Sequence, residues 1–261
     1  MSRIEKYILS QEGDIPLIIS IPHGGTVKIK SIPRRENGVR GIDKATIKLG
    51  KDLIRNINSH LSKMSNELSI PYFVISKVHR AKIDLNRKKS KAYVEDCSIS
   101  KKIYSLYHQK LRTYVLDSIK KFDKAILIDI HGFETDNRPN GFRDVDIVLG
   151  TNNLKSLYSD EIPKKKNWNK NIRGKIIEKM RELNVPVAPE LSRRREYILK
   201  GGFITQKYGA SEIKKSQAIQ IEFSERIRLD FKGDKRKNVL NSLAELLVDE
   251  ILYEDNGVKK V

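Results

Sequence analysis

Two histidines end apolar runs of the sequence in the same way, and this arrangement predicts a shared metal site. His23 follows the run at 16–22 and His131 follows the run at 125–130, and a glycine comes directly after each histidine. Continuous apolar runs without polar alternation are typical of strands buried on both faces of an α/β sheet. Because ligands bind such sheets at the carboxyl ends of the strands, we expect both imidazoles to reach one site. For either histidine alone, a capped turn residue is the alternative interpretation.

The third ligand of this site is not fixed by local spacing. A catalytic zinc site uses about three protein ligands from histidine or carboxylate side chains and keeps one position open for water. The two histidines form no short motif such as His-Glu-x-x-His, so a ligand from elsewhere is needed. Asp43 is a candidate because it precedes the helix expected after the first histidine. The residue pattern alone favours an ordinary N-cap for Asp43.

Glu222 is the candidate for proton transfer. A bound zinc ion acidifies water and polarises a carbonyl group, but a nearby base must still move the proton. Glu222 lies within the otherwise apolar stretch Ala218-Ile-Gln-Ile-Glu-Phe223, where an unpaired carboxylate costs free energy. We therefore predict that Glu222 is the general base. A half-buried residue of an edge strand is the alternative.

Cationic and amide side chains after another expected strand suggest how a substrate is held. Asn86 and Arg87 follow Asp84, and a guanidinium group can bind a carboxylate through two hydrogen bonds. Arg80 could polarise the scissile carbonyl group or bind a second carboxylate. Surface ion pairs are the alternative for these arginines. The paired Gly201 and Gly202 indicate close approach of the backbone to another group.

Strands and helices alternate along the chain, which predicts an α/β fold with a mostly parallel central sheet flanked by helices. We expect one domain over residues 1–261, with its core at about 16–253. Residues 1–15 are expected to be a peripheral lead-in. The expected strands cover 16–21, 70–76, 125–131, 144–151, 185–189 and 216–228. One expected helix begins near Asp43, and the others cover 98–122, 172–183 and 239–251. A tight turn is expected at 201–205.

The chain is strongly basic, with a formal net charge of +19 and a sequence pI of about 9.8. Its lysines and arginines are spread over the whole sequence, and no zinc-finger, helix-turn-helix or RNA-binding motif accompanies them. We therefore expect attraction of anionic substrates rather than dedicated binding of nucleic acid. A single cysteine, Cys97, excludes an internal disulfide framework.

The sequence predicts no membrane association. No apolar run approaches the roughly 20 residues that a membrane helix needs, and the first residues lack the pattern of a signal peptide. The expected location is the cytoplasm.

Taken together, these segments resemble the N-formylglutamate amidohydrolase family over about residues 16–230. The resemblance includes Arg80-Ala-Lys-Ile-Asp-Leu-Asn-Arg87 and Lys200-Gly-Gly-Phe-Ile-Thr-Gln-Lys-Tyr-Gly209, which are its most specific segments. It also includes the segments at 21–25, 129–132, 147–151 and 218–222. One departure is Gly132-Phe133 after the second histidine, where better-known members tend to carry a serine. The loops at 152–168 and 190–199 are also unusually basic.

The resemblance implies a phosphorylase/hydrolase-like fold similar to that of zinc carboxypeptidases. It implies that His23, Asp43 and His131 hold Zn²⁺ or another divalent ion, and that Glu222 acts as general base and then general acid. It further implies that Asn86 and Arg87, with Gly201 and Gly202 nearby, bind the substrate and that Arg80 assists at its carbonyl group.

The sequence thus predicts a metal-dependent amidohydrolase that cleaves an N-acyl amino acid, N-formyl compounds included, with a free carboxylate. Its expected partner is a small anionic N-acyl amino acid or peptide. A metallo-carboxypeptidase or a peptidoglycan-type amidase with the same site is the nearer alternative. A non-catalytic basic module that binds nucleic acid is the more distant one.

Overall fold

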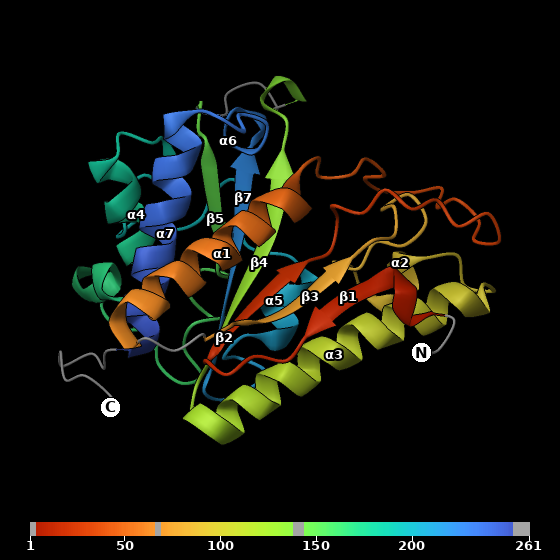
Figure 1. Ribbon diagram of the computed structural model, residues 1–261, viewed down its shortest axis with the longest axis horizontal. Helices are drawn as coiled ribbons and strands as arrows, with labels where there is room; N and C mark the ends of the chain where they lie inside the picture. Colours follow the sequence, from red (N-terminus) through yellow and green to blue (C-terminus); the bar gives the residue numbers. More distant parts are fainter. Residues whose placement is uncertain (1–3, 66–68, 138–143, 253–261) are drawn as a thin grey trace.

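The fold is built on one mixed sheet of seven strands, as a computed structural model covering residues 4–65, 69–137 and 144–252 shows (Figure 1). The strand order is β1-β3-β2-β4-β7-β5-β6, and all neighbouring pairs are parallel except β1–β3 and β5–β7. The strands are β1 (Ile8–Gln11), β2 (Leu17–Ile21), β3 (Tyr72–Ser76), β4 (Ala125–Phe133), β5 (Ile147–Gly150), β6 (Val187–Ala188) and β7 (Ser216–Ser224). The predicted α/β fold with a mostly parallel sheet is confirmed.

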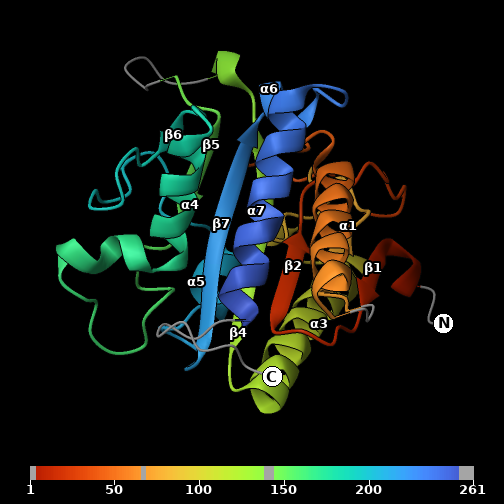
Figure 2. The same cartoon turned by 60° about the vertical axis from the view of Figure 1, so that its left-hand side comes forward.

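Helices cover both faces of this sheet (Figure 2). On one face, α1 (Thr46–Ser65), α4 (Ile172–Glu182) and α7 (Asp234–Leu252) form a layer, and α3 (Ser98–Phe122) and α5 (Phe203–Tyr208) lie on the other. Two short helices, α2 (Lys89–Ala92) and α6 (Glu225–Arg228), follow β3 and β7, and 3₁₀ helices cover Glu5–Tyr7, Thr135–Asn137 and Lys165–Lys170. Within the described residues, no helix is both long and apolar enough to cross a membrane.

The alternation of side chains along each strand separates the core into two parts. Ile19 belongs to the same apolar cluster as Leu53 of α1 and Leu247 of α7, whereas its neighbour Ile18 belongs to the cluster that contains Tyr107 of α3. Because successive strand residues point to opposite faces, a strand between two helical layers is buried at every position and therefore largely apolar. This explains why β2 is buried along its whole length.

Four sequence predictions about the elements are wrong in detail. Residues 8–11 form the edge strand β1. This strand was not predicted because the segment is short and half of its residues are polar. The strand expected to reach residue 228 ends at Ser224, where α6 begins. The closing helix starts at Asp234 rather than at 239. The prediction missed its first turn because that turn is polar and lies outside the apolar pattern. The segment expected to be only a tight turn continues as α5 after Gly202.

One row of polar side chains crosses the sheet near the carboxyl ends of its central strands. In the strand register Ser20 lies beside Asp129, Asp129 beside Gln220, and His131 beside Glu222. All five residues are therefore on the same face of the sheet, the face that α3 and α5 cover farther along. The parallel order of β2, β4 and β7 is what gathers these polar groups at one end.

Candidate metal centre

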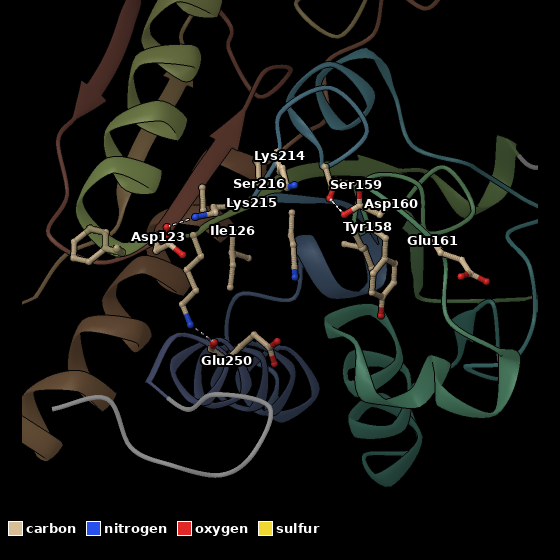
Figure 3. Close-up of a pocket in the computed structure, with 16 residues that line it drawn as sticks. Asp123, Ile126, Tyr158, Ser159, Asp160, Glu161, Lys214, Lys215, Ser216 and Glu250 are labelled. Atoms are coloured by element: carbon tan, nitrogen blue, oxygen red, sulfur yellow. Dashed lines mark hydrogen bonds and ion pairs between the residues drawn. The ribbon is translucent and has the colours of Figure 1, made fainter.

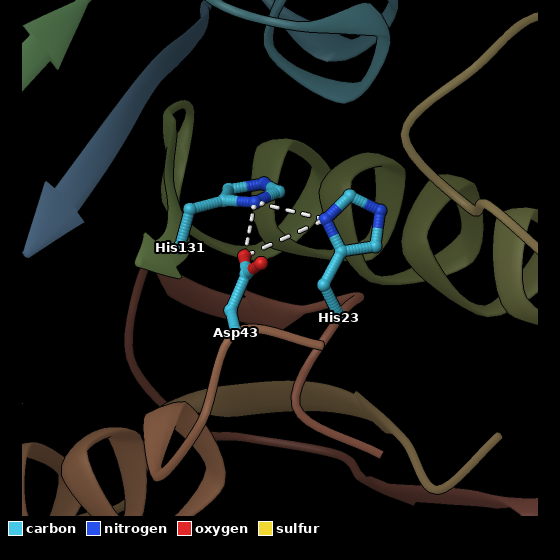
Figure 4. Close-up of side chains that lie close together, drawn as sticks. All are labelled: His23, Asp43 and His131. Carbon is cyan, nitrogen blue, oxygen red and sulfur yellow. Dashed lines mark hydrogen bonds and ion pairs between the residues drawn. The ribbon is translucent and has the colours of Figure 1, made fainter. Parts of the chain in front are cut away.

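The three predicted metal ligands meet at the carboxyl ends of β2 and β4 (Figure 4). His131 Nδ1 lies 3.1 Å from His23 Nδ1 and 3.1 Å from Asp43 Oδ2, and His23 Nδ1 lies 3.6 Å from the same carboxylate oxygen. All three side chains are buried, with exposed fractions of 1%, 6% and 2% for His23, Asp43 and His131. The structure therefore brings together two imidazoles and a carboxylate that are far apart in the sequence.

The loop after β2 places His23 because its glycines allow tight packing. A Cβ atom on Gly24 would lie 2.5 Å from Thr46 Oγ1, and one on Gly25 would lie 2.2 Å from the carbonyl carbon of Lys77. Only glycine therefore fits between the start of α1 and the end of β3. The backbone N–H of Asp43 donates to the carbonyl of His23 at 3.0 Å, which ties the two candidate ligands together.

The Asp43 carboxylate is directed at the cluster rather than at the amides of α1. It accepts a hydrogen bond from the N–H of Gly132 at 3.2 Å, and its other oxygen lies 3.4 Å from Arg80 Nη1. Helix α1 begins three residues later, and Thr46 donates to the carbonyl oxygen of Asp43 instead. The N-cap alternative for Asp43 is therefore wrong.

A second pair of carboxylates orients the two imidazole rings. Asp84 Oδ1 lies 2.7 Å from His23 Nε2, and Asp129 Oδ2 lies 2.9 Å from His131 Nε2. A carboxylate partner favours the ring tautomer in which Nε2 carries the hydrogen, which leaves Nδ1 with a lone pair. Both Nδ1 lone pairs then point at each other and at Asp43, an arrangement of acceptors that a cation stabilises.

The charges around the cluster also favour a cation. Burial alone would lower the pKa of His131, but Asp129 and Asp43 raise that pKa well above its ordinary value. The charged groups of the cluster are four carboxylates and two guanidinium groups: Asp43, Asp84, Asp129, Glu222, Arg35 and Arg80. With both imidazoles neutral, the carboxylates of the cluster outnumber its guanidinium groups, which favours binding of a cation. The donor set of two imidazoles and one carboxylate fits zinc.

Hydrogen bonds hold the orienting carboxylates in turn. Asp129 Oδ1 accepts from Ser20 Oγ at 2.7 Å, and Ser20 Oγ lies 2.9 Å from the hydroxyl of Tyr107 on α3. Asp84 accepts from Arg80 Nε at 3.1 Å and from the N–H of Asn86 at 3.0 Å. Arg80 therefore bridges Asp84 and Asp43, so this guanidinium group fixes the geometry of the cluster.

Glu222 lies beside His131 on β7 and is half-buried. Its Oε1 accepts a hydrogen bond from Gln220 Nε2 at 2.7 Å, and Gln220 Oε1 accepts from the N–H of Gly202 at 2.5 Å. Burial raises the pKa of the Glu222 carboxyl above its ordinary value. A carboxyl group with a raised pKa next to a metal cluster can both take and return a proton.

The predicted substrate-binding residues differ in how free their side chains are. Arg87 is exposed, and in the described part of the chain its guanidinium group makes no ion pair and donates only to the carbonyl of Asn86. Asn86 is buried: its Oδ1 accepts from the N–H of Ile204 at 2.8 Å, and its Nδ2 lies 3.4 Å from Gln220 Oε1. Arg87 is therefore the side chain most available to a ligand carboxylate.

The two predicted glycines shape this region through their backbone. Gly201 has a φ of +88°, and a Cβ atom on Gly202 would lie 2.2 Å from Asn86 Nδ2. Since the N–H of Gly202 donates to Gln220, the glycine pair positions the side chain that holds Glu222. Direct contact of Asn86, Gly201, Gly202 or Arg80 with a substrate stays a prediction.

Two charged neighbours of the candidate ligands were not identified from sequence. Asp84 was noted only as part of the Asp-Leu-Asn-Arg segment, although a carboxylate between Ile83 and Leu85 was a usable signal. Arg35 looked like one of many surface cations, but only 6% of it is exposed and its Nη2 lies 3.5 Å from Asp84 Oδ2. No feature of the basic loop at 26–40 distinguishes Arg35 from its neighbours.

Comparison with known proteins gives one family and several similar folds. The family model of N-formylglutamate amidohydrolase matches residues 95–228, a segment that contains His131 and Glu222. The structure of N-formylglutamate amidohydrolase from Ralstonia eutropha JMP134 is similar, with a TM-score of 0.62, 14% identity, and coverage of 94% of this chain and 97% of that chain. A gene product of Agrobacterium tumefaciens gives a TM-score of 0.58 at 13% identity, over 94% and 92% of the two chains. No curated protein matches the sequence.

Proposed function

The chain belongs to the N-formylglutamate amidohydrolase family, and from this premise we propose that it is a metal-dependent hydrolase cleaving the amide of an N-acyl amino acid with a free carboxylate. N-formyl compounds are included among the substrates. We propose further that residues 1–261 form one catalytic domain.

One observation carries the proposal: two Nδ1 atoms and one carboxylate oxygen converge in a buried cluster, with Glu222 on the adjacent strand. His23, Asp43 and His131 would hold the ion. Zinc or another divalent ion, when bound, supplies Lewis-acid chemistry that acidifies water and polarises a carbonyl oxygen. The separation of roles, with Asp84 and Asp129 orienting the rings and Asp43 facing the ion, supports a metal-binding function.

Glu222 would move the proton. Its carboxylate takes a proton from the attacking water and returns it to the nitrogen of the leaving amine, so the amide C–N bond breaks and a carboxylic acid and an amine form. The hydrogen bond from Gln220 holds one carboxylate oxygen in place and leaves the other for this transfer. Because proton transfer needs a fixed donor–acceptor geometry, the Gly202–Gln220–Glu222 connection supports this role.

Arg87 would select substrates with a free carboxylate. Its exposed guanidinium group can form two parallel hydrogen bonds with a carboxylate, and Arg80 would keep the metal ligands in place next to the reacting carbonyl group. Substrates in which this carboxylate is amidated should therefore react poorly.

A panel of N-formyl, N-acetyl and N-succinyl amino acids, with amidated counterparts, tests the proposal. The metal-loaded protein should release the free amino acid from at least one acyl series and discriminate against its amidated form, and Glu222→Gln should hydrolyse the same compound about 10²–10⁴-fold more slowly. The proposal fails if the metal-loaded protein hydrolyses none of these acyl series, or if Glu222→Gln hydrolyses them as fast as wild type.

A further inference from the structure

A cavity outside the metal centre has only cations among its charged lining residues. It encloses about 530 Å³ between the loop at 26–41 and the turn at 79–82. Its basic side chains are Lys28, Lys30, Arg34, Arg40, Lys82 and the imidazole of His79, which we call the basic pocket. No aspartate or glutamate lines it. A concave surface of one charge sign concentrates the electric field and attracts counter-ions.

The backbone around the basic pocket is fixed by hydrogen bonds. The N–H of Val27 donates to the carbonyl of Lys77 at 2.9 Å, and the N–H of His79 donates back to the carbonyl of Val27 at 3.0 Å. Lys82 Nζ donates to the carbonyl of Ile32. These contacts join the loop to the turn, so the cations are held near one another without a ligand.

Among the residues that the structure describes, most of the cations of the pocket have no carboxylate partner. Within the residues that the structure describes, Lys28, Lys30 and Arg34 form no ion pair, and Arg40 donates only to the carbonyl of Glu36 at 3.3 Å. Burial lowers the pKa of His79, and Lys28, Arg34 and Lys82 lower it further. The neutral ring accepts from the N–H of Ala81 at Nδ1, at 3.0 Å, and therefore offers an N–H at Nε2.

One turn of the chain separates this pocket from the metal centre. Arg80 points to Asp43 and Asp84 of the cluster, whereas its neighbours His79 and Ala81 line the pocket. Consecutive Cα atoms are about 3.8 Å apart, so the two sites share a wall that is one backbone segment thick. The two sites are therefore close neighbours in the fold.

We propose that the basic pocket binds the further carboxylates of an acidic N-acyl peptide whose amide is cleaved at the metal centre. The inference rests on the proposed function and adds a substrate class to it: chains with several carboxylates, in addition to single N-acyl amino acids. A peptide is favoured over nucleic acid because no phenylalanine, tyrosine or tryptophan lines the pocket for base stacking. Carboxylates can instead form charge-assisted hydrogen bonds with these lysines and arginines.

Equilibrium binding of a fluorescent, N-acetylated oligoglutamate to the full-length protein tests the inference without turnover. The pocket variant is Lys28→Glu/Arg34→Glu, and the matched control is Lys165→Glu/Lys166→Glu, which makes the same change in charge at exposed lysines of another surface. We expect the pocket variant to bind about tenfold more weakly than wild type and the control to bind nearly as well as wild type. Both variants should hydrolyse a single-carboxylate N-acyl amino acid at the wild-type rate.

Other outcomes overturn the inference. Equal weakening in both variants would show a general charge effect, and no weakening in the pocket variant would show that the probe binds elsewhere. Competition by inorganic phosphate alone at concentrations matching the peptide would make the pocket a phosphate site. Tighter, pocket-dependent binding of a single-stranded oligonucleotide would assign it to nucleic acid. If the protein is inactive on every N-acyl compound but its binding of the peptide still depends on the pocket, the proposed function is refuted. Peptide binding by the basic pocket then stands without the cleavage.

Discussion

The two ends of β4 and β7 each carry charged residues, but only one end has the organisation of a reaction centre. At the carboxyl end, His131 and Glu222 belong to a buried cluster in which negative charge exceeds positive charge. At the amino end, Ala125 and Ser216 line a cavity of about 570 Å³ (Figure 3). Its charged residues include both signs, as in the ion pair between Lys215 and Asp123. A large cavity therefore does not by itself mark a reaction centre, whereas unbalanced buried charge does.

The difference arises from what the protein itself neutralises. Most charges at the amino end are solvent-exposed and both signs are present, so water and neighbouring opposite charges stabilise them without a ligand. At the carboxyl end, each imidazole is oriented by its own carboxylate, and the lone pairs that remain converge without a counter-charge. Burial makes such an imbalance costly, which is why it favours binding of a cation.

The largest effect on activity is expected for Glu222→Gln. This change keeps the shape of the side chain and removes the proton acceptor, so kcat should fall about 10²–10⁴-fold while metal content stays at the wild-type level. Single-turnover kinetics together with metal analysis would measure both. Wild-type turnover by this variant would show that the proton is carried by another group.

A smaller effect is expected for Asp84→Asn at the carboxyl end. The variant loses the charged acceptor for His23 Nε2, and metal affinity should fall about 10–100-fold. Titration of the metal-free protein with Zn²⁺ and a competing chelator would give the affinity. If Asp84→Asn binds the ion as tightly as wild type, Asp84 does not orient a metal ligand.

The matched change at the amino end should have almost no effect. Asp160→Asn removes an exposed carboxylate whose hydrogen bond is to the adjacent Ser159. We expect unchanged metal affinity and kcat/KM, and a free energy of unfolding within about 0.5 kcal/mol of wild type. A loss of activity comparable to that of Asp84→Asn would remove the distinction between the two ends.

The parts of the fold and site that follow from local sequence could be predicted. Apolar runs such as 125–130 predict buried strands because both faces of a central strand are covered. A histidine directly after each of two such strands predicts convergence, since the carboxyl ends of parallel strands lie at one edge. The edge strand β1 was not predicted, because half of its residues are polar and its burial depends on pairing with β3.

Features that depend on loop packing could not be predicted. Arg35 and Lys28 lie in the same basic loop, yet Arg35 is buried against Asp84 while Lys28 lines the basic pocket. Their neighbours in sequence give no reason for this difference, because it arises from contacts with the turn at 79–82. The residue pattern also favoured an N-cap for Asp43 over a ligand, since both roles suit a carboxylate that precedes a helix.

The metal content of wild type, His131→Ala and the control His60→Ala tests the central claim most directly. His60 lies on α1 and contacts Asn241, outside the cluster. After loading with Zn²⁺ and removal of excess metal, wild type and His60→Ala should retain about one ion per chain, and His131→Ala close to none with its circular dichroism unchanged. If wild type retains as little zinc as His131→Ala, or His131→Ala retains as much as wild type, the three side chains do not form a metal centre.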